Sequence, residues 1–446
     1  MSDWNLFFKS KKITVMGLGL LGRGVGDAVF LAEHGADLIV TDLKPSTALG
    51  SSLRKLRKYK NIRYTLGRHK LEDFSARGGQ AKPDFILKAA GVPLDSPYVA
   101  EARKNKIPIE MDASLFAKLM PKGVILVGVT GTRGKSTTTA LIYEILKAAG
   151  RTVYKGGNLV PEATLPLLKK VKAGDIVVLE LDSWQLQGFH DANISPQVAV
   201  FTTFLDDHLT YYKGDKKRYF EDKTAIFQYQ KKGDVLVVGE QVSKFIPPRA
   251  FLTARSADIP KEWKIKLLGE HNRENIACAV AASRSLGVPD ATIKKAVEGF
   301  TGLPNRLEYL RTVRGVKIYN DNNATTPDAT IAALRALGKK IILIMGGTDK
   351  GLDMSKLVAE IPKHCKAVIL LKESGTEKIK ESIKGYVLSI MIEERDTLKE
   401  CVEEAMKIAK KDDIVLFSPA FASFGKWFKN EYDRGEQFVK IVDKIH

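Results

Sequence analysis

This chain has few cysteines and no long apolar run. Only three cysteines occur in its 446 residues, too far apart for a disulfide framework or a metal-ligand motif. No apolar stretch approaches the roughly 20 residues that a membrane-spanning helix needs, and the first residues lack the apolar core of a signal peptide. These absences predict a cytoplasmic protein with reduced thiols and no membrane span.

The chain also lacks runs of interleaved aromatic residues, although it is strongly basic. Its formal net charge is +19, from 71 Lys and Arg against 52 Asp and Glu, a surplus that can mark a nucleic-acid-binding protein. Here the basic residues are spread through many segments, and no aromatic stacking surface accompanies them. We therefore expect small anionic substrates and no nucleic acid. A noncatalytic nucleotide-binding protein stays open as an alternative.

Three segments of alternating strands and helices follow one another, at 1–111, 112–302 and 303–446. A chain of 446 residues is too long for one core. Apolar runs such as 12–16 and 176–179 are predicted as buried strands, with helical stretches between them. The alternation predicts an α/β fold with parallel sheets in all three domains, Rossmann-like at both ends and of the P-loop mononucleotide-binding type in the centre.

The most informative motif is a glycine-rich turn, Gly128-Val-Thr-Gly-Thr-Arg-Gly-Lys135-Ser-Thr-Thr, between an apolar strand and an amphipathic helix. Such a turn lets backbone N–H groups surround phosphates, while the lysine reaches the terminal phosphates and a hydroxyl holds Mg²⁺. Val129 replaces the first glycine of the strict P-loop pattern, so we interpret the run as a variant nucleotide loop. The predicted ATP-binding residues here are Gly131, Thr132, Gly134, Lys135, Ser136 and Thr137.

A second glycine-rich loop, Gly17-Leu18-Gly19-Leu-Leu-Gly22, follows the predicted strand at 12–16. Asp42 lies twenty positions after its last glycine, as in dinucleotide-binding loops. The pattern predicts a pyrophosphate at the next helix N-terminus and a ribose or base contact for Asp42. A further loop containing Gly91 is predicted to face the same ligand.

Together with other motifs, these loops resemble those of the Mur ligase family, the ATP-dependent amide-forming enzymes of cell-wall precursor synthesis. The further segments that carry the resemblance are Gly156-Gly-Asn158, Glu180-Leu-Asp-Ser-Trp, Asp207-His208, Lys223, Gly269-Glu-His-Asn272, Asn275, Gly302-Leu-Pro-Asn-Arg306, Asn320-Asp321, Thr325, Gly346-Gly-Thr-Asp-Lys350 and Ser418-Pro-Ala-Phe-Ala-Ser423. The resemblance covers nearly the whole chain. It implies a UDP-sugar in the N-terminal domain, with no nicotinamide chemistry.

The resemblance implies that ATP activates the carboxylate of UDP-N-acetylmuramoyl-L-alanine as an acyl phosphate, which the nitrogen of D-glutamate attacks. We expect the enzyme to be a monomer. Catalysis would fall on Lys135, His208, Lys223 and Arg306. The remaining ATP contacts would be Asn272, Asn275, Arg306 and Asp321. The UDP-sugar would contact Gly17, Leu18, Gly19, Asp42, Gly91 and Asn158, and the amino acid would contact Thr325, Lys350 and Ser423.

Two Mg²⁺ ions are implied by the same resemblance, held by Ser136, Glu180, His208 and a carbamylated Lys223. Glu180 ends an apolar strand, and an acid there faces the ligand crevice of an α/β sheet. For Lys223, helix spacing alone favours an ordinary lysine on the helix surface, so both interpretations stay open.

Two departures from the family pattern leave the acceptor amino acid open. Asn323 stands where a lysine is usual, which removes a positive charge beside the reacting carboxylates, and Asp182 stands where a hydroxyl is common. D-glutamate is the first hypothesis. Another amino acid or another Mur step is the alternative.

Overall fold

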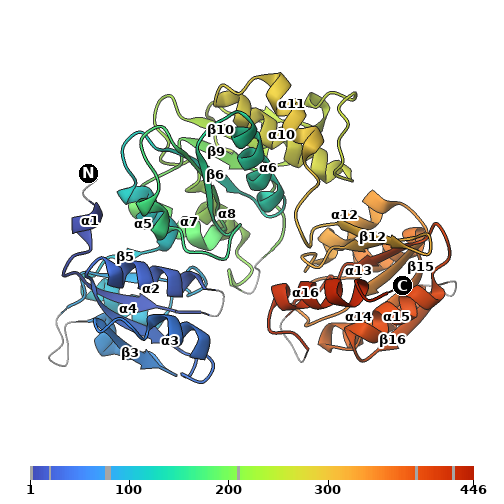
Figure 1. Ribbon diagram of the computed structural model, residues 1–446, viewed down its shortest axis with the longest axis horizontal. Helices are drawn as coiled ribbons and strands as arrows, with labels where there is room; N and C mark the ends of the chain where they lie inside the picture. The colour runs from blue at the N-terminus through green and yellow to red at the C-terminus, as the bar shows by residue number, and fades with distance from the viewer. Residues whose placement is uncertain are drawn as a thin grey trace. The chain divides into compact units, whose positions relative to one another are not determined.

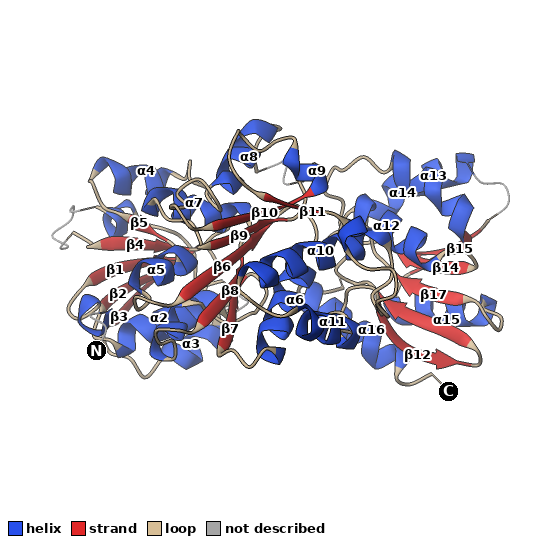
Figure 2. Cartoon of the chain, turned by 90° about the horizontal axis from the view of Figure 1, so that it is seen from above, coloured by secondary structure: helices blue, strands red, loops and turns tan. Residues whose placement is uncertain are grey.

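The computed structural model describes residues 4–19, 22–75, 82–207, 211–386, 390–423 and 427–445. They form three sheets, drawn as groups of red strands bordered by blue helices in Figure 2. The chain divides into two compact units, Met1–Trp263 with Glu274–Glu298, and Lys264–Arg273 with Gly299–His446. The predicted α/β fold is confirmed, while the domain boundaries at 111 and 302 stay predictions. Within the described ranges, no helix is long and apolar enough to cross a membrane.

The first sheet has the order β3-β2-β1-β4-β5 and is parallel throughout. Figure 1 draws this part of the chain in blue. Its strands are β1 (Lys12–Met16), β2 (Asp37–Asp42), β3 (Ile62–Leu66), β4 (Phe85–Lys88) and β5 (Ile109–Glu110). Its helices are α1 (Trp4–Phe7), α2 (Arg23–Glu33), α3 (Gly50–Leu56) and α4 (Pro97–Lys104), with a 3₁₀ turn at Leu71–Phe74. The strand order reverses between β1 and β4, and ligands of open α/β sheets bind at the carboxyl ends of such strands.

The second sheet is also parallel, with the order β11-β10-β9-β6-β8-β7. Its strands are β6 (Ile125–Thr130), β7 (Val153–Gly157), β8 (Ile176–Glu180), β9 (Val198–Phe201), β10 (Val235–Gly239) and β11 (Leu252–Ala254). The helices of this region are α5 (Asp112–Leu119), α6 (Lys135–Ala148), α7 (Ser183–Ala192), α8 (Lys216–Thr224), α9 (Glu240–Ser243), α10 (Glu270–Ser285) and α11 (Asp290–Gly299), with 3₁₀ turns at Leu165–Lys169 and Ser256–Asp258.

One continuous cluster of buried apolar side chains joins the first two sheets. It runs from Phe30 and Leu31 of α2 to Phe116 of α5 and Leu165 in the 3₁₀ turn. Burying side chains of this size stabilises a fold by about 1.5–3 kcal/mol each. The cluster therefore holds the carboxyl ends of β1 and β4 in a fixed relation to the second sheet.

The third sheet has the order β12-β13-β17-β14-β15-β16 and is mixed. Its strands are β12 (Glu308–Val313), β13 (Val316–Asn320), β14 (Ile341–Met345), β15 (Cys365–Leu371), β16 (Met391–Arg395) and β17 (Ile414–Phe417). Its helices are α12 (Pro327–Leu337), α13 (Ser355–His364), α14 (Ser374–Tyr386), α15 (Leu398–Ile408) and α16 (Glu431–Val442).

The prediction of a wholly parallel third sheet was wrong, because β12 pairs antiparallel with β13. Only Arg314 and Gly315 separate the two strands, and both have positive φ, 50° and 78°. Two such residues form the tight turn of a β-hairpin. A parallel pair would need a much longer crossover connection.

Candidate active site

The nucleotide loop lies between β6 and α6, and its two central glycines are required by their surroundings. Gly131 has φ +148°, and a Cβ there would lie 2.0 Å from the Thr202 hydroxyl oxygen. Gly134 has φ +84°, and a Cβ there would lie 2.1 Å from the amide oxygen of Asn275. No other residue type fits such positions without strain. The structure thus brings Asn275, a predicted ATP contact, against the loop.

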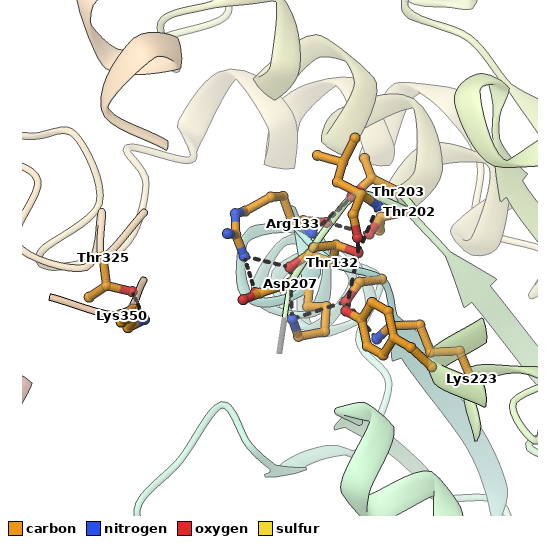
Figure 3. Close-up of polar contacts among 12 residues, drawn as sticks. Thr132, Arg133, Thr202, Thr203, Asp207, Lys223, Thr325 and Lys350 are labelled. Atoms are coloured by element: carbon orange, nitrogen blue, oxygen red, sulfur yellow. Dashed lines mark hydrogen bonds and ion pairs between the residues drawn. The ribbon is translucent and has the colours of Figure 1, made fainter. Parts of the chain in front are cut away.

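The segment after β9 braces the same loop (Figure 3). The N–H of Thr132 donates to the Thr203 carbonyl at 2.7 Å, and the N–H of Arg133 donates to the Thr203 hydroxyl at 2.8 Å. The Arg133 guanidinium forms an ion pair with Asp207 at 2.8 Å. His208, the predicted metal ligand next in the chain, lies outside the described residues.

Two lysines from different helices donate to one carbonyl of the nucleotide loop. The ammonium of Lys135, at the start of α6, lies 3.1 Å from the Gly131 carbonyl oxygen. The Nζ of Lys223, near the end of α8, lies 3.0 Å from the same oxygen. Two amino groups therefore lie beside the loop, and the ammonium form of such a group attracts the anionic phosphates of a nucleotide.

Lys223 is only 1% exposed, so the interpretation as an ordinary surface lysine is wrong. Burial lowers the pKa of Lys223 well below its ordinary value, and the neighbouring Lys135 adds to that decrease. Helix spacing missed this because α8 ends at Thr224 and packs its last turn under the nucleotide loop. The neutral amine that results is the form that can react with CO₂ to give a carbamate.

Glu180 ends β8, and the strand register pairs it with Val129, two residues before Gly131. Its side chain is 2% exposed. One carboxylate oxygen accepts from the Asn158 amide at 3.4 Å, while the other is buried without a partner among the described residues. A buried unpartnered carboxylate oxygen is costly, and oxygen atoms are the ligands that Mg²⁺ prefers.

The Glu180 carboxylate and the buried hydroxyl of Ser136 at the start of α6 are oxygen donors of the kind that suits Mg²⁺, and their role as its ligands stays a prediction. The parts of the chain that the structure describes contain no cluster of three His, Cys, Asp or Glu that could hold a metal ion. A two-ligand site of this kind suits Mg²⁺, which keeps several waters and shares its coordination with substrate phosphates.

A cavity of about 330 Å³ lies beside the first glycine-rich loop. It brings together five of the six predicted UDP-sugar contacts: Gly17, Leu18, Gly19, Gly91 and Asn158. A Cβ on Gly17 would lie 2.9 Å from the Ala89 side chain, so this glycine allows the loops after β1 and β4 to approach each other. The cavity is consistent with a sugar-nucleotide site at the strand-order reversal.

Asp42, the sixth predicted contact, lies behind this loop rather than in the cavity lining. One of its carboxylate oxygens accepts from the N–H groups of Leu18 at 2.9 Å and Gly19 at 3.0 Å. The other oxygen accepts from the N–H of Lys44 at 2.8 Å. Asp42 thus braces the loop, and its contact with a ribose or base stays a prediction.

The three predicted amino-acid contacts gather at the carboxyl ends of neighbouring strands of the third sheet. Lys350 donates to the Thr325 hydroxyl at 3.2 Å (Figure 3). Thr348 and Ala422 exchange two backbone hydrogen bonds, at 3.0 and 3.1 Å, which brings buried Ser423 close to the Lys350 loop. A cation with two hydroxyls is suited to bind a carboxylate.

The remaining predicted ATP contacts have local roles in the structure. Both carboxylate oxygens of Asp321 accept hydrogen bonds, from Leu307 N–H and the Ser418 hydroxyl, each at 2.9 Å. Burial raises the pKa of Asp321 to about 7. The Asn272 amide donates to the Leu268 carbonyl at 2.8 Å, and Arg306 is exposed. Their contacts with a nucleotide stay predictions.

Sequence reasoning missed Arg434 of α16, which is fully buried. Its guanidinium donates to the side-chain oxygen of Asn322 at 2.7 Å and to the Asn322 carbonyl at 2.8 Å. A third bond, at 3.3 Å, reaches the Phe421 carbonyl. Arg434 therefore ties together the loops that carry Thr325 and Ser423. No motif in the sequence marked Arg434, because its partners lie far from it in the chain.

Asp182, one of the departures from the family pattern, has a local explanation. Its carboxylate accepts from the Gln185 N–H at 2.8 Å and caps α7, and the Gln185 side chain accepts from the Asp182 N–H at 3.2 Å. Aspartate caps a helix as well as serine does. Nothing in the structure explains Asn323.

Family models match two parts of the chain: the Mur ligase middle domain at residues 129–246, and the Mur ligase glutamate ligase domain at residues 305–421. A UDP-N-acetylmuramoylalanine–D-glutamate ligase from a Roseiflexus species is 36% identical over 98% of this chain and 99% of its own length. This chain belongs to the Mur ligase family.

Solved structures of other Mur ligases share the fold. The UDP-N-acetylmuramate–alanine ligase MurC from Thermotoga maritima matches 97% of this Mur ligase and 99% of its own chain, with a TM-score of 0.60 and 22% identity. The MurF ligase from the same organism, solved in complex with ADP, matches 99% of this chain and 96% of its own, with a TM-score of 0.58 and 19% identity.

Proposed function

We propose that this Mur ligase uses ATP to join D-glutamate to UDP-N-acetylmuramoyl-L-alanine, acting as a cytoplasmic enzyme. The full-length similarity to a ligase named for these substrates supports the proposal. The free, buried thiols of Cys278, Cys365 and Cys401 are consistent with a reducing compartment. The observation that carries the proposal is the group of Lys135, Lys223 and the unpartnered Glu180 oxygen around one nucleotide loop.

The reaction must bring two anions together. A carboxylate oxygen of the UDP-sugar attacks the γ-phosphorus of ATP, the bond to ADP breaks, and an acyl phosphate forms. The amino-acid nitrogen then attacks the carbonyl carbon, phosphate leaves and an amide remains. Lys135 and the N–H groups at the start of α6 would offset the phosphate charge. The chain mostly supplies position and charge, as in other phosphoryl transfers.

Mg²⁺, when bound, would neutralise phosphate charge, and Ser136 with Glu180 are the residues that would hold it. We further propose that Lys223 carries a carbamate and serves a second Mg²⁺ together with His208. The buried amine with a depressed pKa supports the first half of this proposal. Conversion to a carbamate would replace the buried neutral amine by an anion next to Lys135.

The acceptor is proposed to lie between Lys350, Thr325 and Ser423, with Arg434 holding their loops in position. D-glutamate carries two carboxylates, and a lysine with two hydroxyls provides partners for one of them. The positive charge missing at Asn323 is the reason to consider another amino acid.

An amino-acid panel tests the function directly. Phosphate release would be measured with ATP, Mg²⁺ and UDP-N-acetylmuramoyl-L-alanine, adding one D- or L-amino acid at a time. We expect release with D-glutamate to exceed release with each other amino acid by at least about tenfold, because a built carboxylate site discriminates strongly. Release that is equal for all amino acids, or absent with all of them, would reject the proposal.

A further inference from the structure

The structure contains a buried lysine that neither the nucleotide loop nor the acceptor loops use. Lys88 is the last residue of β4 and is only 1% exposed. It lines the 330 Å³ cavity together with Gly17 and Gly91. No role was predicted for it from the sequence, because it ends an apolar strand without any recognisable motif.

The ammonium of Lys88 has only backbone partners among the described residues. It donates to the carbonyls of Ala89 at 3.2 Å, Ala90 at 3.3 Å and Val92 at 2.7 Å. Asp182 is the carboxylate that influences Lys88 most, and its oxygen caps α7 instead of pairing with the lysine. A buried cation without a carboxylate partner is unstable unless a counter-charge reaches it.

These three bonds fix the turn that begins the loop after β4. The N–H of Val92 donates back to the Ala89 carbonyl at 3.1 Å, which closes a β-turn over Ala90 and Gly91. That bond already holds the peptide between Ala89 and Ala90. The peptide between Ala90 and Gly91 has the Lys88 ammonium as its one hydrogen-bond partner in the described part of the chain.

Because a trans peptide points its carbonyl and N–H in opposite directions, holding the Ala90 carbonyl also aims the Gly91 N–H. Gly91 lines the cavity, and no acceptor for its N–H occurs within the described ranges. A cation on the carbonyl side polarises the peptide and strengthens the N–H as a donor. The first glycine-rich loop cannot supply the same donors, since Asp42 already accepts from its Leu18 and Gly19 N–H groups.

We propose that Lys88 is a positioning residue of the sugar-nucleotide pocket. It holds the Ala89–Val92 turn so that the Gly91 N–H donates to the diphosphate, and its charge offsets part of the diphosphate's negative charge. This inference rests on the proposed function, because it requires a diphosphate-bearing ligand in the 330 Å³ cavity. Burial lowers the pKa of Lys88 to about 7, and an anionic ligand would favour its charged form.

The test compares wild type with Lys88→Met, Lys88→Gln and Lys88→Arg. The control is Lys104→Met, which removes an exposed lysine of α4 in the same compact unit. The dissociation constant of UDP, melting temperature, kcat and the KM of each substrate would be measured for every variant. Lys88→Gln keeps an N–H donor group for the carbonyls but removes the positive charge. It therefore tests the effect of the charge even if Lys88→Met does not fold.

We expect Lys88→Met and Lys88→Gln to raise the UDP dissociation constant and the KM of the UDP-sugar by roughly tenfold or more. The KM of ATP and kcat should stay within about twofold. Lys88→Arg should restore part of the affinity, and Lys104→Met should behave as wild type. A purely structural lysine would instead lower the melting temperature and raise the KM of ATP as well, and that result would overturn the inference.

Two outcomes separate this inference from the function on which it rests. Wild-type affinity for UDP in a folded Lys88→Gln protein would overturn the role of Lys88 and leave the ligase proposal intact. A wild-type chain that binds no UDP would overturn both.

Discussion

The loop after β1 and the loop after β6 are both glycine-rich turns between a strand and a helix, but different charges meet their backbones. In the first loop, the Asp42 carboxylate accepts from the N–H groups of Leu18 and Gly19. In the second, the side-chain nitrogens of Lys135 and Lys223 donate to the Gly131 carbonyl. Two glycine-rich loops therefore differ in their neighbours: a carboxylate accepts from the backbone of the first, and two lysine side chains donate to the backbone of the second.

Glycine spacing therefore predicts the shape of a loop, whereas the charged residues around the loop determine which phosphates the loop can bind. A triphosphate needs cationic partners, and Lys135 with Lys223 lies directly against the second loop. In the first pocket, we infer that the turn after β4 binds the anion in place of the glycine-rich loop. Lys88, the last residue of β4, donates to the carbonyls of that turn. The two loops can therefore be tested separately, because each should control the affinity of a different substrate.

The largest effect should come from Lys135→Ala, which removes a cation from the second loop. We expect phosphate release that depends on both the UDP-sugar and an amino acid to fall by at least about 1,000-fold, since a developing phosphoryl charge loses its counter-ion. UDP affinity should stay at the wild-type value. Lys147→Ala, on the exposed side of the same helix α6, is the matched control. Unchanged release in Lys135→Ala would remove the main support for catalysis at this loop.

Lys223→Met should have the next largest effect, a decrease in kcat of roughly 100-fold, because the proposed carbamate ligand is lost. Wild-type activity should also fall in CO₂-free buffer and recover with bicarbonate, whereas the residual activity of the variant should not respond. The control is Lys217→Met on the same helix, whose lysine is 87% exposed and lies 3.8 Å from Glu221. Activity in CO₂-free buffer equal to that with bicarbonate would contradict the carbamate.

The sequence was sufficient for the α/β fold and for the position of Glu180 as the last residue of the buried strand β8, while its role stays a prediction. It failed where a role depends on packing between distant segments. For Lys223, helix spacing alone favoured a surface lysine, and only the family resemblance singled it out as a functional residue. Arg434 gave no pattern because its partners, Asn322 and Phe421, lie elsewhere in the chain. Lys88 was missed for a different reason: its partners are close neighbours in the chain, and no sequence motif marks the turn that they form.

Asp42→Ala tests the first loop and should have a smaller effect. Removal of the carboxylate leaves the Leu18 and Gly19 N–H groups without an acceptor, which costs about 1–3 kcal/mol of folding free energy. We expect the KM of the UDP-sugar to rise by roughly tenfold as the loop loosens, with the KM of ATP unchanged. Asp42→Asn, which keeps an acceptor oxygen, should lie close to wild type. Tighter UDP binding in Asp42→Ala would mean that the carboxylate only blocks the loop.

The smallest effect should come from a substitution of Asp27 of α2, another carboxylate that lines the first pocket. It should change how the free energy of unfolding depends on pH. Asp112 accepts from the N–H groups of Thr164 and Leu165, which favours its ionised form. Burial and the neighbouring Asp112 raise the pKa of Asp27 well above its ordinary value. We therefore infer that Asp27 holds the proton that the two carboxyl groups share.

A raised pKa in the folded state means that the proton on Asp27 stabilises the fold fully below the unfolded-state pKa of about 4. That contribution is lost as the pH rises through the folded-state pKa. An asparagine side chain at this position has no titratable proton to lose. The variant Asp27→Asn should therefore become more stable than wild type by a margin that widens with pH, on the order of 1 kcal/mol at pH 8. Urea unfolding between pH 4 and 8 measures this margin. The control is Asp191→Asn, at an exposed position of α7, whose stability difference from wild type should not change with pH. A difference for Asp27→Asn that also stayed constant would mean that the two carboxyl groups share no proton.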